Sequence, residues 1–159
     1  MKKILLYTMT FLLSVFLVGC NTGNADTTGG KDKKPTQYDT VNNFEGVSMS
    51  VKESSVSPTG LTVIFENKSD EQGVYSEDFL LEEEIEGNWY EVPTIVDEYG
   101  FAEPGYELPP SKTEEFAVEW ESLYGNLDSG NYQIIKSMSN VREPGDYDEY
   151  YLAAQFKIE

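Results

Sequence analysis

Carboxylates are the side chains most able to do chemistry in this sequence, because the chain has 29 Asp and Glu residues, no His and a single Cys. Three of them, Asp146, Asp148 and Glu149, follow Gly145 in a stretch that we predict to be a loop. Calcium takes about six to eight oxygen ligands from flexible loops, so these side chains could supply part of a calcium shell. Since the Asp-x-Asp-x-Asp-Gly spacing is absent, we predict no resident metal or cofactor and leave calcium open at this loop.

The composition excludes several kinds of catalytic site. Without histidine the chain cannot assemble a Ser-His-Asp triad, a Cys-His pair or a histidine zinc site. Successive members of Glu82-Glu83-Glu84 point to opposite faces of a predicted strand, so they cannot converge on one ion, and we expect them to be solvated. A carboxylate pair for glycoside hydrolysis needs a substrate cleft, which a domain of this size rarely forms. We therefore predict that the protein is not an enzyme.

The N-terminus has the layout of an export signal. A basic start precedes a mostly apolar run over residues 4–18, which is short for a membrane span and typical of a secretory signal. The run ends in Leu17-Val18-Gly19-Cys20, which resembles the lipobox of bacterial lipoproteins. The resemblance implies a signal peptide over 1–19, acylation of Cys20 and a stable lipid anchor on the extracytoplasmic face of the cell membrane. The alternative is an ordinary secretion signal with an incidental cysteine.

Composition divides the rest of the chain into two parts. Residues 20–43 are rich in Thr, Gly, Asn, Asp and Lys, so we predict a lipidated N-terminus followed by a flexible linker. Residues 44–159 are predicted to form a single domain. Between 45 and 159 there are 26 acidic and six basic residues, a net charge of −20. Such a domain repels phosphate backbones, which excludes nucleic acid as a partner.

Period-two alternation predicts β-strands throughout this domain. Apolar and polar residues alternate over 47–51, 61–66, 79–85, 89–92, 116–120, 132–136 and 151–158. We predict a polar loop over 67–73, a long loop with one short edge strand over 94–110, one helical turn over 121–124, and a loop over 139–149. Many short strands separated by turn signals predict an all-β sandwich.

One stretch of this domain resembles a known family. Trp120-x-x-Leu123-Tyr124-Gly125-x-Leu127-x-x-Gly130-x-Tyr132-x-Ile134-x-Lys136 follows a predicted hairpin that contains Trp89. The pattern resembles a bacterial immunoglobulin-like domain of secreted and lipid-anchored Gram-positive proteins, over about residues 44–158. The resemblance implies an immunoglobulin-like β-sandwich of about seven to nine strands. It implies structural roles for Trp89, Trp120, Tyr124, Gly125, Asp128, Gly130 and Tyr132.

Asp128 and Tyr132 are predicted to form a specific contact. Asp128-x-Gly130-x-Tyr132 lies where a sandwich domain has a tyrosine corner, in which a tyrosine hydroxyl bonds back to upstream backbone. The sequence departs from antibody-type domains because it has no cysteine pair.

Aromatic side chains in the irregular segments are the candidates for ligand binding. Tyr99, Phe101, Tyr106 and Tyr147 lie in predicted loops, and they would form one tyrosine-rich binding surface if these loops met at one end of the sandwich. The alternative is that these rings plug the ends of the sandwich.

Together these patterns predict a lipid-anchored, extracytoplasmic immunoglobulin-like binding or sensing module without catalytic activity. We expect a monomeric domain whose partners are the membrane, through the anchor, and a protein or cell-wall component. The alternative is a structural or accessory subunit of a membrane or cell-wall complex that docks through an edge strand.

Overall fold

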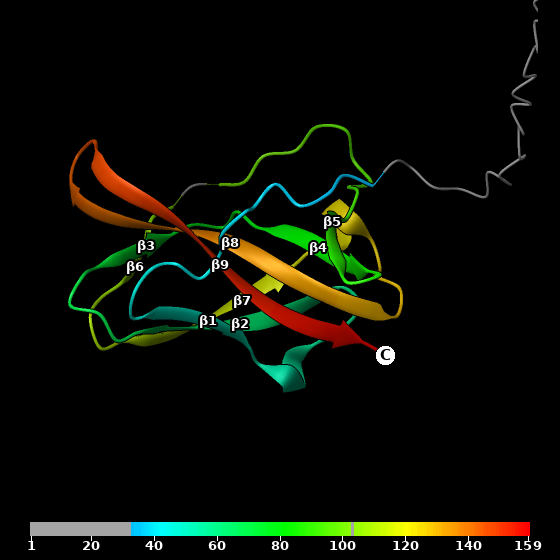
Figure 1. The fold of residues 1–159 in the computed structure, drawn as a ribbon, viewed down its shortest axis with the longest axis horizontal. Helices are drawn as coiled ribbons and strands as arrows, with labels where there is room; N and C mark the ends of the chain where they lie inside the picture. The colour runs from blue at the N-terminus through cyan, green and yellow to red at the C-terminus, as the bar shows by residue number, and fades with distance from the viewer. Residues whose placement is uncertain (1–32, 103) are drawn as a thin grey trace, which may run out of the picture.

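The computed structural model describes residues 33–102 and 104–159, so Cys20 and the signal peptide lie outside the described residues. This part of the chain is almost entirely β, as predicted, with nine strands in two antiparallel sheets (Figure 1). One sheet contains β1 (Val47–Val51), β2 (Gly60–Asn67) and β7 (Thr113–Glu119), in that order. The other follows the order β5-β4-β8-β3-β6, and β9 pairs with β8. Its strands are β3 (Gly73–Tyr75), β4 (Leu80–Ile85), β5 (Asn88–Glu91), β6 (Tyr106–Leu108), β8 (Gly130–Glu143) and β9 (Asp146–Ile158). No helix among the described residues is long and apolar enough to cross a membrane.

The hydrophobic core lies between the two sheets. Val63 and Phe65 of β2 have no exposed surface, and neither do Ile134 and Met138 of β8. The predicted alternation explains this arrangement, because every second side chain of a strand points to the same face. The ring of Phe65 also packs against that of Tyr75, with 4.5 Å between the centroids.

Trp120 closes one end of the core. Its side chain has no exposed surface, and its indole N–H donates a hydrogen bond to the Pro58 carbonyl at 2.8 Å. Its backbone N–H donates to the Thr59 carbonyl at 2.9 Å. The predicted helical turn follows as α1 (Glu121–Tyr124) and ends at Gly125, whose φ of 72° lies in a region that favours glycine.

The next turn is held by Tyr132. Its hydroxyl donates to the Asp128 carbonyl at 3.0 Å, which is the contact that the sequence pattern predicts. The ring is buried and packs against Phe156 with 5.7 Å between the centroids. Burial raises the pKa of Tyr132 to about 12, with smaller contributions from Glu83 and Asp128. The hydroxyl therefore remains a donor over the whole neutral range.

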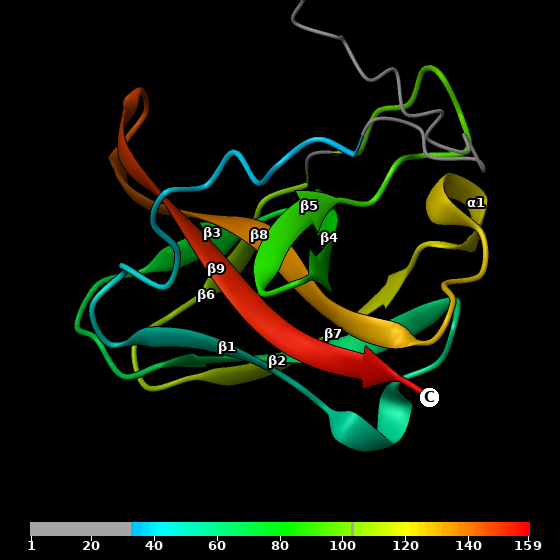
Figure 2. The same ribbon diagram turned by 45° about the vertical axis from the view of Figure 1, so that its right-hand side comes forward.

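The prediction of a loop over 139–149 is wrong. β8 continues to Glu143 and β9 begins at Asp146, so the two strands form a long hairpin that projects beyond the sandwich (Figures 1 and 2). The turn contains Gly145, whose φ is 86°. Sequence alternation missed the hairpin tip because residues 141–149 are exposed on both faces and no buried apolar row is present. The short strand β3 and the 3-10 turn η1 (Glu53–Ser55) were also not predicted.

Residues 33–44, which we call the N-terminal strap, pack on the six-stranded sheet (Figure 2). The beginning of the strap pairs with the edge of β5. The Thr36 N–H donates to the Trp89 carbonyl at 2.9 Å, and the Glu91 N–H donates to the Lys34 carbonyl at 2.8 Å. Figure 2 shows the strap then running across the six-stranded sheet toward β9, on the opposite edge.

The end of the strap covers part of the β9 edge. Asn42 accepts a hydrogen bond from the Ala153 N–H at 2.9 Å and donates to the Ala153 carbonyl at 3.1 Å. Its own N–H donates to the Tyr151 carbonyl at 2.7 Å. The prediction of a flexible linker is therefore wrong for residues 33–43, which belong to the folded domain. The remainder of that predicted linker, 20–32, lies outside the described residues.

Candidate functional site

The three candidate calcium ligands do not converge. Asp146 and Asp148 lie on β9 near the hairpin tip, where the Arg142 guanidinium donates to them at 2.6 and 2.7 Å. The hydrogen bond from Arg142 lowers the pKa of the Asp146 carboxyl. Glu149 lies on the opposite face of the strand and accepts a bond from the Tyr151 hydroxyl at 2.8 Å. Within the described part of the chain, no three potential ligands are arranged to hold a metal ion.

The candidate aromatic residues are separated in the structure. Tyr147 lies at the hairpin tip opposite Val141, and 57% of Tyr147 and 42% of Val141 are exposed. Tyr99 lies 5.7 Å from Phe101, measured between ring centroids, and Phe101 packs on Phe79 at 5.1 Å. Figure 2 shows the hairpin tip and the loop around residue 99 on opposite sides of the molecule.

The length of β8 accounts for this separation. The Phe79 cluster continues to Tyr124 in α1, at a centroid distance of 6.0 Å, and β8 begins a few residues later. From Tyr132 to Val141 the strand advances by about 30 Å. The hypothesis of one tyrosine-rich surface is therefore wrong for Tyr99 and Tyr147.

Tyr106 occupies a third place, on the short edge strand β6 that the sequence predicted. Its ring lies 5.4 Å from the rings of both Tyr75 and Phe116, and its hydroxyl donates to Glu77 at 3.2 Å. Tyr106 thus packs against the side of the core at β6, apart from both Tyr99 and Tyr147.

Lys136, the last residue of the family-like pattern, is a buried ionisable residue to which the sequence assigned no role. It is 1% exposed and lies on the inner face of β8, with its Nζ 4.7 Å from the Phe116 ring centroid. The Nζ donates to the carbonyls of Ser76 and Asp78 at 2.9 and 2.7 Å. Burial lowers the pKa of Lys136 to about 8, against the opposing effects of Asp78 and Glu77. The contacts assign Lys136 a structural role, because they join β8 to the segment that leads into β4.

Glu82 contradicts the prediction that the side chains of Glu82-Glu83-Glu84 are all solvated, because it has no exposed surface. Gln133 of β8 lies opposite it. The strap residue Tyr38 lies nearby: burial raises the pKa of this tyrosine, and the charge of Glu82 contributes to the rise. One carboxylate oxygen accepts a bond from the Gln133 amide at 2.7 Å. The other has no partner among the described residues.

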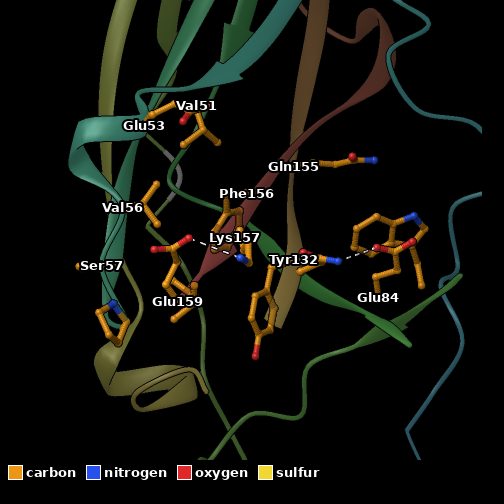
Figure 3. Close-up of a pocket in the computed structure, with 14 residues that line it drawn as sticks. Val51, Glu53, Val56, Ser57, Glu84, Tyr132, Gln155, Phe156, Lys157 and Glu159 are labelled. Atoms are coloured by element: carbon orange, nitrogen blue, oxygen red, sulfur yellow. Dashed lines mark hydrogen bonds and ion pairs between the residues drawn. The ribbon is translucent and has the colours of Figure 1, made fainter. Parts of the chain in front are cut away.

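A groove of about 860 Å³ lies beside the C-terminal half of β9. Figure 3 shows Val51, Glu53 and Val56 on one side of it and Glu84 on the other, with Phe156 and Lys157 between them. Its lining is mixed, since apolar side chains from β1 and β9 meet carboxylates at the rim.

The groove contains an uncovered strand edge. The Ala153 N–H and carbonyl point away from β8, toward Asn42. Backbone groups of alternate residues in an antiparallel strand point the same way, so those of Gln155 and Lys157 face this edge too. No described residue pairs with them along this edge. Sequence reasoning could not find this site, because which strand lies at an edge depends on strand order.

The comparisons with known proteins agree with the architecture. A family model for the bacterial Ig-like domain matches residues 43–157. No curated protein and no solved structure gives a significant match.

Proposed function

We propose that this chain, which belongs to the bacterial Ig-like domain family, is a lipid-anchored extracytoplasmic binding module without catalytic activity. The lipobox-like Leu17-Val18-Gly19-Cys20 supports the anchor. The family supports a binding or structural role, because domains of this architecture position loops and strand edges for contacts with other molecules.

One geometric observation supports the proposal that the hairpin end of the domain binds a partner. The strap begins at Lys33 beside β4 and β5, where Lys33 pairs with Glu83, whereas the β8–β9 hairpin projects from the other end of β8 (Figure 1). An anchor attached before residue 33 would thus leave the hairpin free to meet a protein or cell-wall partner. Tyr147 and Val141 supply exposed apolar surface at its tip.

The anchor is tested by fractionating cells that express Cys20→Ser. We expect this variant to leave the membrane fraction and to lose labelling by a fatty-acid analogue. Gly19→Ala is the matched control, because it keeps a small residue before the cysteine and should remain anchored. Membrane retention of Cys20→Ser would refute lipidation as the tether.

The hairpin is tested by placing a photo-crosslinking amino acid at position 147 or 99 of the full chain in cells. We expect discrete crosslinked products from position 147 and none from position 99, which has similar exposure at the other end. Products from position 99 alone would assign binding to the opposite end of the domain.

A second candidate function is an accessory subunit of a membrane or cell-wall complex. The uncovered edge of β9 favours it, because strand edges recruit partner strands.

A further inference from the structure

The two halves of the β9 edge differ in a way that points to a binding role. Over Tyr151 and Ala153, the backbone groups of this edge bond to Asn42. Over Gln155 and Lys157 the same edge opens into the groove, and no described residue pairs with it. Proteins commonly cover or shorten exposed strand edges, because an open edge templates pairing with another chain. The strap covers this edge at Tyr151 and Ala153 and leaves it open beside the groove, at Gln155 and Lys157.

The groove is shaped for an extended chain beside this edge. Figure 3 shows Val51 and Val56 on one side of the groove and Phe156 of β9 beside them. Pro58 and Ile158 add to this apolar lining. In an added strand, alternate side chains would point to this apolar surface and to solvent. Backbone bonds to β9 would give affinity, and the apolar lining would select the inward side chains.

The charge around the groove favours one kind of occupant. Glu53 and Glu84 lie at its rim. The one basic side chain of the described lining, Lys157, forms an ion pair with Glu159, with 3.4 Å between Nζ and Oε1. The domain as a whole carries 20 more acidic than basic residues between 45 and 159. A second copy of the chain would therefore be repelled, whereas a basic segment would be attracted.

We propose that the open edge of β9 at Gln155 and Lys157 binds an extended, basic segment of a partner protein by strand addition. This binding needs neither the lipid anchor nor the hairpin tip, so it can fail without affecting those two proposals. It rests on the same strand edge as the accessory-subunit candidate and names the kind of partner that this edge would take.

The experiment uses the full chain in detergent and two fluorescent heptapeptides of alternating residues, one of Lys and Val and the other of Glu and Val. Binding is followed by fluorescence anisotropy, and hydrogen–deuterium exchange is followed in fragments that cover residues 152–159. We expect the Lys-Val peptide to bind more tightly and to slow exchange of the Gln155 and Lys157 amides. Its affinity should also fall as salt is raised.

Two proline variants test the backbone contact. Lys157→Pro removes an N–H that faces the groove but leaves the β8 ladder intact, since proline is tolerated on an outward edge position. We expect it to weaken peptide binding about fivefold or more. Glu149→Pro is the matched control: it removes an N–H from the same edge outside the groove, and peptide affinity should stay unchanged.

A charge variant covers the case in which Lys157→Pro does not fold. Glu53→Gln combined with Glu84→Gln leaves the backbone untouched and should also weaken Lys-Val binding.

Several results would overturn the proposal: no binding of either peptide at millimolar concentration, equal binding of both, or equal effects of the two proline variants. Slow exchange of Gln155 and Lys157 in the free chain would also overturn it. If that protection rises with protein concentration, the occupant is a second copy, and otherwise it is a segment of the same chain.

Discussion

Asn42 and Ala153 form a two-bond pair in which the Asn42 side chain takes the place of a neighbouring strand. The amide of Asn42 accepts from the Ala153 N–H and donates to the Ala153 carbonyl. The two residues are 111 positions apart, so this pair joins the start of the described chain to its last strand. Asn42 adopts a φ of 58°, a conformation that asparagine tolerates better than most residues.

Replacing Asn42 should loosen the strap. Asn42→Gly removes both side-chain bonds but suits the positive φ, so we expect it to lower the free energy of unfolding by about 1 kcal/mol. Asn42→Ala also adds backbone strain and should cost about 1 kcal/mol more. Urea unfolding measures the stabilities, and hydrogen exchange should show a faster Ala153 amide in both variants. An unchanged Ala153 exchange rate would contradict the role assigned to this pair.

Tyr132→Phe tests the hydroxyl bond at the start of β8. The ring keeps its packing against Phe156, but the bond to the Asp128 carbonyl is lost. We expect the free energy of unfolding to fall by about 1 kcal/mol in urea titrations. Tyr147→Phe is the control, since this exposed position should change stability by less than about 0.5 kcal/mol. Equal effects of the two substitutions would mean that the bond from the Tyr132 hydroxyl to the Asp128 carbonyl adds nothing to stability.

Lys136 should make stability depend on pH. Its pKa is about 8 in the folded chain and 10.5 is the ordinary value, so between these pH values the unfolded state binds more protons. Stability should therefore rise from pH 8 to about 10.5, because the cost of burying the charged amine disappears. Urea unfolding at several pH values measures this slope, and Lys136→Met, which cannot titrate, should lack the rise. The same slope in both proteins would show that other groups cause it.

Calcium and magnesium should affect the protein equally. Arg142 already binds Asp146 and Asp148, and Glu149 faces away from them. At matched ionic strength we expect both ions to shift the thermal unfolding midpoint by the same small amount, through screening of surface charge. A rise specific to calcium would reveal a site that binds the native state and would contradict this expectation.

Contacts that are local in sequence were the predictable ones. The bond between Tyr132 and Asp128 spans four residues, and the turn of α1 spans Glu121–Tyr124, so short patterns contain all the information needed. The sandwich was predictable as well, because its strands bury one face and expose the other. These features together determine where the core lies, but they do not locate a binding site.

Contacts between distant residues could not be predicted. Glu82 is polar and buried on the outer face of β4, where it meets Gln133, 51 positions later in the chain, and lies near Tyr38 of the strap. The open edge at Gln155 likewise depends on the absence of a neighbouring strand in the described sheet. The hairpin tip was missed for another reason: strands without a buried face carry no apolar alternation.

The strap also determines how the domain would respond to mechanical load. A pull on the chain at Lys33 would first act on the bonds from Lys34 and Thr36 to β5, which lie at one edge of the sheet and can open one after another. Peeling would free residues 33–43, a segment that reaches at most about 36 Å when fully extended, before any force acted on β1. The strap can thus detach from the sheet and extend under tension while the hydrophobic core remains packed.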